Sequence, residues 1–184
     1  MVEEIKNTKP EREAIVSSSS TPKRIVNIVS GEKERYDTGI QELNRVWGGG
    51  LVKGSLTLIS GDPGIGKSTL LLQTANNIAL KYGKVLYTSG EESEEQIKIR
   101  GDRLGASSDN LYIVSETNIA VIAKYVEEMK PTFVIIDSIQ TMYKDTVASA
   151  PGSVSQVREC SNELMRIGKN NSIPLFIVAH VTKQ

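Results

Sequence analysis

Short apolar runs alternate with amphipathic stretches over most of this chain. The apolar runs have the length of buried strands and lie at residues 55–60, 85–89, 111–114, 133–137 and 174–179. Between them, apolar residues recur three and four positions apart, which predicts helices over about 66–82, 93–104, 119–129 and 154–168. Strands and helices that alternate in this way form βαβ units. The predicted fold class is therefore α/β, with a mostly parallel central sheet and helices on both faces.

The N-terminal residues do not follow this pattern. Residues 1–23 are charged and are interrupted by Pro10, by the serine run 17–20 and by Pro22. Such a segment buries too little apolar surface to offset the entropy that it loses on ordering. We therefore expect a flexible tail or linker here and the folded core over 24–184.

Two short elements are expected between this tail and the first core strand. A weak alternation over residues 24–29 suggests a short additional strand. A short helix is expected over about 40–46, with Leu43 and Val46 facing inward.

The composition narrows the possible functions. Lys+Arg and Asp+Glu both number 22, so the formal net charge is zero. A protein that binds a duplex through its overall charge would be basic, so any contact with nucleic acid must be local. No apolar run approaches the roughly 18 residues of a membrane span, and the N-terminus lacks the apolar stretch of a secretory signal. We therefore expect a cytoplasmic protein without membrane contact.

The single cysteine excludes an internal disulfide. Because the chain also has only one histidine, a zinc site is not expected. Cys160 is expected to be a small buried apolar residue on a helix. The alternative is a reactive thiol.

The junction between the first core strand and the following helix carries the pattern G-x-x-x-x-G-K-[S/T], which is typical of a phosphate-binding loop. Glycines let backbone N–H groups surround the phosphates, and the helix adds its positive N-terminal end. Lys67 is expected to reach the β- and γ-phosphates of a nucleoside triphosphate, and the Ser68 hydroxyl to bind Mg²⁺. The expected nucleotide-binding residues are Gly61, Asp62, Pro63, Gly64, Ile65, Gly66, Lys67, Ser68 and Thr69. The alternative is an ordinary glycine turn, which the strand before it and the helix after it disfavour.

Two further strand ends carry carboxylates. Asp137 follows four apolar residues and is expected to position Mg²⁺, although Asp137 and Ser138 are also suited to cap a helix or loop. Glu91 and Glu92 follow the strand 85–89. We expect Glu91, together with Lys67, to be catalytic, with Glu91 accepting a proton from the water that attacks the γ-phosphate. The alternative is that these acids only favour the positive end of the next helix.

A histidine and a long loop lie at the same predicted sheet edge. His180, just beyond the last apolar strand, is equally suited to sense the γ-phosphate or to be a structural residue. The loop between Thr141 and Ser155 is rich in small residues and is longer than a connection without a function usually is. It follows Asp137 closely, so it is placed to couple the nucleotide state to a partner, although only Lys144 and Arg158 supply positive charge there.

In combination these residues resemble the ATPase core of the bacterial RadA (Sms) DNA-repair proteins, which are RecA-like members of the P-loop superfamily. The matching blocks follow one another between about residue 36 and residue 184. They are residues 38–50, 61–68, 89–93, 134–140, 149–159 and 180–183. The Ser-Ala-Pro-Gly-Ser-Val block and the His-Val-Thr-Lys ending are more specific than the phosphate loop alone.

The resemblance implies a RecA-like fold and DNA-dependent hydrolysis of ATP with Mg²⁺. It also implies homo-hexameric rings that act as a helicase-like motor, with a RecA-type recombinase as partner, in branch migration and the processing of recombination intermediates. Glu91 falls at the position of the family's catalytic carboxylate, and His180 at the strand end that senses the γ-phosphate. The loop over 141–155 falls where the family places its first DNA-contacting loop.

The chain also departs from the family's usual pattern. The four-cysteine zinc finger that normally precedes the linker has no counterpart here, and neither the Lys-Asn-Arg-Phe-Gly motif nor the Lon-protease-like domain is present. The expectation is therefore a truncated core that binds ATP but hydrolyses it slowly and assembles poorly. A nucleotide-gated binding or assembly switch with incidental turnover is the main alternative. A small-molecule P-loop kinase is a weaker one, because no arginine-bearing lid is evident.

Overall fold

The computed structural model describes residues 21–29, 34–61 and 65–180. The chain divides into two units, Met1–Glu32 and Lys33–Gln184, which are described separately. Most of the predicted tail over residues 1–23 lies outside the described residues, so its boundary with the core at residue 24 stays a prediction.

In the first unit, a single turn of 3-10 helix, η1 (Ile25–Asn27), replaces the predicted strand. The Asn27 N–H donates to the Arg24 carbonyl at 2.9 Å. The side chains of Ile25 and Val26 are 84% and 83% exposed. The prediction of a strand is wrong because no described strand pairs with this segment, and its backbone closes local hydrogen bonds instead.

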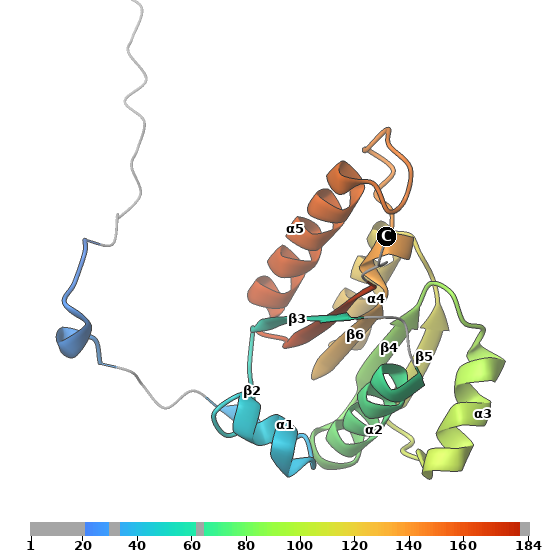
Figure 1. Cartoon of the computed structure of the whole chain (residues 1–184), viewed down its shortest axis with the longest axis horizontal. Coiled ribbons are helices and arrows are strands. Elements are labelled where there is room, and N and C mark those ends of the chain that lie inside the picture. The colour runs from blue at the N-terminus through green and yellow to red at the C-terminus, as the bar shows by residue number, and fades with distance from the viewer. Residues whose placement is uncertain (1–20, 30–33, 62–64, 181–184) are drawn as a thin grey trace, which may run out of the picture. The chain divides into compact units, whose positions relative to one another are not determined.

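The second unit is built on a five-stranded parallel sheet in the order β3-β7-β6-β4-β5 (Figure 1). Its strands are β3 (Leu56–Gly61), β4 (Val85–Ser89), β5 (Leu111–Ser115), β6 (Phe133–Asp137) and β7 (Leu175–His180). The three central strands are almost entirely buried, as expected when helices cover both faces of a parallel sheet. The predicted α/β fold class is confirmed.

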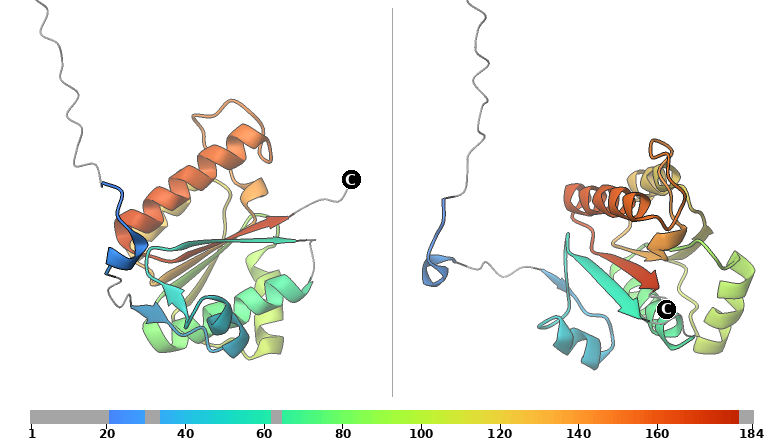
Figure 2. Two further views of the ribbon diagram at one scale, coloured as in Figure 1. Left: turned by 60° about the vertical axis from the view of Figure 1, so that its left-hand side comes forward. Right: turned by 45° about the horizontal axis from the view of Figure 1, so that its top comes forward.

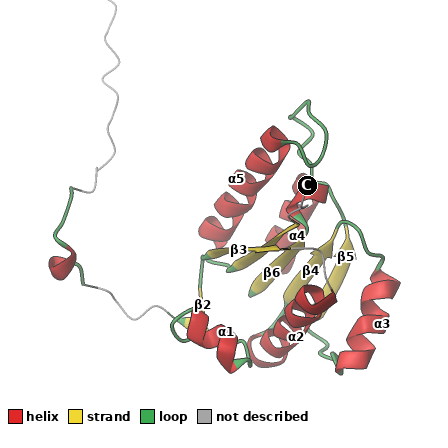
Figure 3. Cartoon of the chain, viewed as in Figure 1, coloured by secondary structure: helices red, strands yellow, loops and turns green. Residues whose placement is uncertain are grey.

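Helices cover the sheet on both faces (Figures 2 and 3). The helices α2 (Ile65–Tyr82) and α3 (Glu94–Leu104) pack on one face, and α4 (Ile119–Met129) and α5 (Val154–Asn171) on the other. Each face has its own apolar core, because successive strand residues point to opposite sides. None of the helices in the described ranges is long and apolar enough to span a membrane.

The helix α5 is three residues longer than predicted because Gly168 does not end it. A Cβ on Gly168 would lie 2.2 Å from Leu175 Cδ1, so the glycine allows close packing of the helix on β7. Ser172, with a positive φ of 53°, ends the helix instead. Cys160 is fully buried on this helix, as predicted. Burial raises the pKa of its thiol to about 11, which disfavours a reactive thiol.

A small subdomain precedes β3. It consists of the short antiparallel strands β1 (Arg35–Tyr36) and β2 (Leu51–Val52) and the helix α1 (Gln41–Val46). Val46 is 76% exposed, so the prediction that it faces inward is wrong. The next residue, Trp47, faces the core instead and packs against Phe176 with 5.0 Å between the ring centroids.

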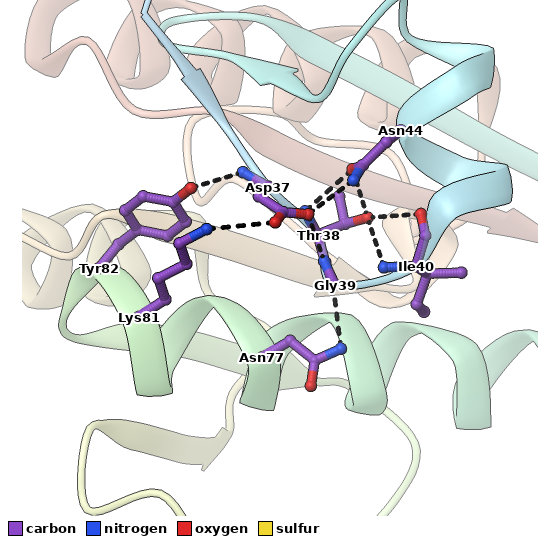
Figure 4. A network of polar contacts seen from close by, with 8 residues as sticks. All are labelled: Asp37, Thr38, Gly39, Ile40, Asn44, Asn77, Lys81 and Tyr82. Atoms are coloured by element: carbon purple, nitrogen blue, oxygen red, sulfur yellow. Dashed lines mark hydrogen bonds and ion pairs between the residues drawn. The ribbon is translucent and has the colours of Figure 1, made fainter.

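A polar network fastens this subdomain to α2 (Figure 4). The Asp37 carboxylate accepts hydrogen bonds from the Gly39 N–H at 2.9 Å and from the Asn44 side chain at 2.6 Å, and it pairs with Lys81 at 3.2 Å. The Tyr82 hydroxyl accepts the Asp37 N–H at 2.7 Å. The contacts with Gly39, Asn44 and Lys81 lower the pKa of Asp37 to about 2, with the Gly39 N–H as the largest cause.

Candidate functional site

The phosphate loop joins β3 to α2. Of its residues, Asp62, Pro63 and Gly64 lie outside the described residues, as does the side chain of Ile65. Gly61 ends β3, and Gly66, Lys67, Ser68 and Thr69 lie in the first turns of α2. The N-terminus of this 18-residue helix therefore points its positive end at the loop.

Lys67 is the most informative residue of this loop. Its Nζ atom is buried and has no hydrogen-bond partner among the described residues. The ammonium lies directly against Gly61, where an added Cβ would be 3.2 Å from Nζ. A buried cation without a partner is costly. A phosphate in the loop would give it one, so the residues present fit a nucleoside triphosphate.

The other predicted residues meet at the carboxyl ends of the strands. Ser68, Thr69, Glu91, Asp137 and His180 all line one cleft of about 600 Å³. Asp137 and His180 share the sheet face that α2 covers, because they follow Ile135 and Val178 at even spacing on their strands. Site residues that lie at separate strand ends in the sequence are therefore brought together around one cleft in the structure.

Asp137 is buried and is held by both of its carboxylate oxygens. Its Oδ2 accepts a hydrogen bond from the Tyr87 hydroxyl at 3.0 Å, and its Oδ1 lies 3.4 Å from His180 Nε2. Burial and, next, the charge of Asp137 raise the pKa of Tyr87 well above its ordinary value, so the hydroxyl stays protonated.

The structure distinguishes the two neighbouring glutamates. Glu92 forms an ion pair with Arg100 of α3. Glu91 lines the same cleft, and its carboxylate has no ion pair or hydrogen bond to another described residue. The backbone N–H groups of Glu91 and Glu92 are fixed on the Ser89 hydroxyl oxygen at 3.4 and 3.0 Å. Glu91 is therefore the available carboxylate.

Gly90 places Glu91 close to the end of β6. Its N–H donates to the Asp137 carbonyl at 2.8 Å. A Cβ on Gly90 would lie 1.9 Å from Thr141 Oγ1, so no other residue fits without displacing Thr141. Thr141 is the last residue of the 3-10 helix η2 (Ile139–Thr141) and the first residue of the long loop.

The long loop is organised by one buried side chain. Gln156, 2% exposed near the start of α5, donates to the carbonyls of Lys144, Val147 and Ser149 at 3.4, 3.4 and 3.0 Å. Its Oε1 accepts the Lys144 N–H at 3.0 Å. The Lys144 ammonium pairs with Glu163 at 3.6 Å, whereas Arg158 is exposed. One of the two positive charges expected for this loop is therefore paired within the protein.

No group of three or more His, Cys, Asp or Glu side chains within the described ranges is arranged to hold a metal ion. Magnesium in nucleotide sites is usually held by one or two protein oxygens, nucleotide phosphates and water. Ser68 and Asp137, which line the same cleft, fit that pattern.

The sequence also matches proteins that are already known. A family model described as an AAA domain matches residues 22–184. The chain belongs to this AAA domain family. It is 53% identical over 189 residues to the DNA repair protein RadA of Bacillus subtilis, a match that covers 100% of this chain and 41% of the relative. The predicted resemblance to RadA ATPase cores is confirmed.

Two other relatives carry the same name. The DNA repair protein RadA of Listeria monocytogenes is 52% identical over 188 residues, which are 100% of this chain and 41% of the relative. That of Streptococcus pyogenes is 50% identical over 181 residues, which are 98% of this chain and 40% of the relative. The chain spans about two fifths of the length of the curated relatives it matches.

Proposed function

We propose that this protein is a DNA-dependent ATPase motor core that acts with Mg²⁺ in recombinational DNA repair, in branch migration and the processing of recombination intermediates. The observation that carries the proposal is the meeting of Ser68, Glu91, Asp137 and His180 in one cleft, beside the buried Lys67 ammonium. Membership of the AAA domain family and the identity with RadA proteins support it. The proposal includes a tail over residues 1–23 and an ATPase core over 24–184.

Each of these residues has a role in the proposed reaction. Lys67 binds the β- and γ-phosphates, and His180, whose Nδ1 has no partner among the described residues, contacts the γ-phosphate. The Ser68 hydroxyl and Asp137 would hold Mg²⁺, which would supply charge neutralisation on the phosphates. Glu91 accepts a proton from the attacking water, because it lines the cleft and its carboxylate has no other partner in the described chain.

The ATPase rate, measured with and without single-stranded DNA, tests this function. We expect DNA to raise the rate of the wild type. The Glu91→Gln variant should bind ATP normally but hydrolyse it about 100-fold or more slowly, because general-base catalysis contributes roughly 10²- to 10⁴-fold. Glu95→Gln is the matched control, since Glu95 is an exposed acid in the first turn of α3.

The two measurements separate the hypotheses. Unchanged turnover in Glu91→Gln would show that Glu91 is not the base. ATP binding and turnover that DNA does not affect would contradict the motor and support the nucleotide-gated switch.

We further propose that DNA contacts the loop over residues 141–155, and that the whole protein forms homo-hexamers and acts with a RecA-type recombinase. The exposed Arg158 beside the loop is the cation best placed for a phosphate contact. DNA binding should weaken as the salt concentration increases. Arg158→Ala should reduce the slope of the logarithm of affinity against the logarithm of salt concentration by about 1, the value expected for the loss of one phosphate contact. Binding that is independent of salt would contradict the contact.

A further inference from the structure

Tyr87 reaches Asp137 from the neighbouring strand. Its hydroxyl donates to Asp137 Oδ2 at 3.0 Å, between two buried side chains. In the register of β4 and β6, Tyr87 lies opposite Ile135 and Ser89 lies opposite Asp137. Ser89 uses its hydroxyl oxygen to accept backbone N–H groups of the next loop. The long Tyr87 side chain, crossing diagonally, therefore takes the position beside Asp137.

Arg100 supports Tyr87 from α3. Its guanidinium forms an ion pair with Glu92, and its second terminal nitrogen lies 3.5 Å from the Tyr87 oxygen. The Arg100 side chain is 18% exposed and also lines the cleft. The donors point in one direction, from Arg100 to Tyr87 to Asp137, and in such a chain each hydrogen bond polarises the next.

This arrangement gives the two oxygens of Asp137 different surroundings. Oδ2 is committed to Tyr87, whereas Oδ1 lies beside His180, which lines the cleft with Asp137. A carboxylate held at one oxygen cannot rotate freely, so the oxygen presented to the cleft is fixed. Partners of this kind, which orient a metal-binding group from behind, commonly change metal affinity 10- to 100-fold when they are removed.

We propose that Tyr87 is a positioning residue that fixes the Asp137 carboxylate for Mg²⁺, and that Arg100 holds Tyr87 in place. This inference rests on the proposed function, because it assumes that Asp137 serves bound Mg²⁺ and ATP. It adds Tyr87, which does not line the cleft, and Arg100, which lines it from α3.

The test is the Tyr87→Phe variant, which removes one oxygen and keeps the ring in the core. Binding of a fluorescent ATP analogue is measured over a series of free Mg²⁺ concentrations and in EDTA. We expect the Mg²⁺ concentration at half-maximal enhancement of binding to rise about tenfold, with binding in EDTA unchanged. Loss of packing alone would weaken binding in both conditions. Tyr112→Phe is the matched control, because Tyr112 on β5 is 42% exposed and does not line the cleft.

The outcomes are distinguishable. If the wild type itself binds the analogue without any Mg²⁺ dependence, the proposed function fails. If the wild type depends on Mg²⁺ and folded Tyr87→Phe matches it, this inference alone is overturned. Should Tyr87→Phe not fold, Arg100→Gln is measured in the same way. A roughly two- to fivefold shift toward higher Mg²⁺ with unchanged binding in EDTA is then expected, below the tenfold effect of removing the direct partner. Because Arg100 also lines the cleft, weaker binding in EDTA would mean that Arg100 contacts the nucleotide directly, and that result or wild-type behaviour of Arg100→Gln would overturn the inference.

Discussion

Gln140 holds His180 by both of its backbone polar groups. The Gln140 amide donates to the His180 carbonyl at 2.9 Å, and its Oε1 accepts the His180 N–H at 3.1 Å. The ladder between β6 and β7 ends at Asp137 and Val178, so no strand residue pairs with His180 on this side. The Gln140 side chain forms the two hydrogen bonds that a neighbouring strand would otherwise form with His180, and it joins η2 to the end of β7.

The Gln140→Met variant should therefore make the His180 backbone less rigidly held without creating a cavity. We expect the free energy of unfolding to fall by about 1–3 kcal/mol, because two backbone groups lose their partners. If His180 contacts the γ-phosphate, the preference for ATP over ADP should also decrease. Calorimetric titration with each nucleotide measures this ratio. Gln73→Met on the exposed side of α2 is the control. An unchanged ratio of ATP to ADP affinity in Gln140→Met would show that Gln140 does not help His180 to distinguish the two nucleotides.

Replacement of Lys67 should separate binding from stability. In Lys67→Met the phosphate loop loses its ammonium, so the thermal shift that saturating ATP gives the wild type should disappear. The nucleotide-free protein should not be less stable than the wild type, because a buried charge without a described partner has been removed. Thermal melts with and without ATP measure both effects. A clear loss of stability without nucleotide would mean that Lys67 has a structural partner.

Site residues that can be recognised from their neighbours in the sequence could be predicted. Lys67 is marked by the phosphate-loop pattern and Asp137 by the apolar run before it, and the structure places Lys67 at the start of α2 and Asp137 at the end of β6. Tyr87 and Gln140 could not be predicted, because their contacts depend on which strands are neighbours. Tyr87 resembles any other core residue of a buried strand, and nothing in the sequence places Gln140 against His180. The one available signal is a hydroxyl-bearing aromatic residue in an apolar strand that ends at the site.

The end of α5 could not be predicted for a related reason. A glycine after an amphipathic stretch usually ends a helix, and Gly105 does so after α3. Gly168 has a different role, because Leu175 packs so closely on the helix that its Cδ1 would lie 2.2 Å from a Cβ at this position. The two glycines look alike in the sequence, and only the position of β7 distinguishes them.

The Asp37 network predicts a pH-dependent contribution to stability. The pKa of Asp37 is lowered to about 2 in the folded state, so its contribution is present above the ordinary pKa of about 4 and is lost as the pH falls toward 2. Wild type should be more stable than Asp37→Asn at about pH 6, and this difference should shrink below about pH 4. Urea unfolding at several pH values measures it.

Asp102→Asn is the control for this comparison. Asp102 pairs with Lys98 on the exposed side of α3, and such surface pairs contribute little. A difference between wild type and Asp37→Asn that stays constant down to about pH 2 would show that the Asp37 charge does not stabilise the fold.

The long loop should lose its order when Gln156 can no longer donate hydrogen bonds. Gln156→Glu keeps the shape of the side chain but places carboxylate oxygens against the carbonyls of Val147 and Ser149. We expect a loss of about 2–4 kcal/mol in the free energy of unfolding and faster proteolytic cleavage within residues 144–153. Limited proteolysis followed by mass spectrometry locates the cut. Asn162→Asp on the exposed face of α5 is the control, and a Gln156→Glu loop as resistant as the wild type would show that other contacts order it.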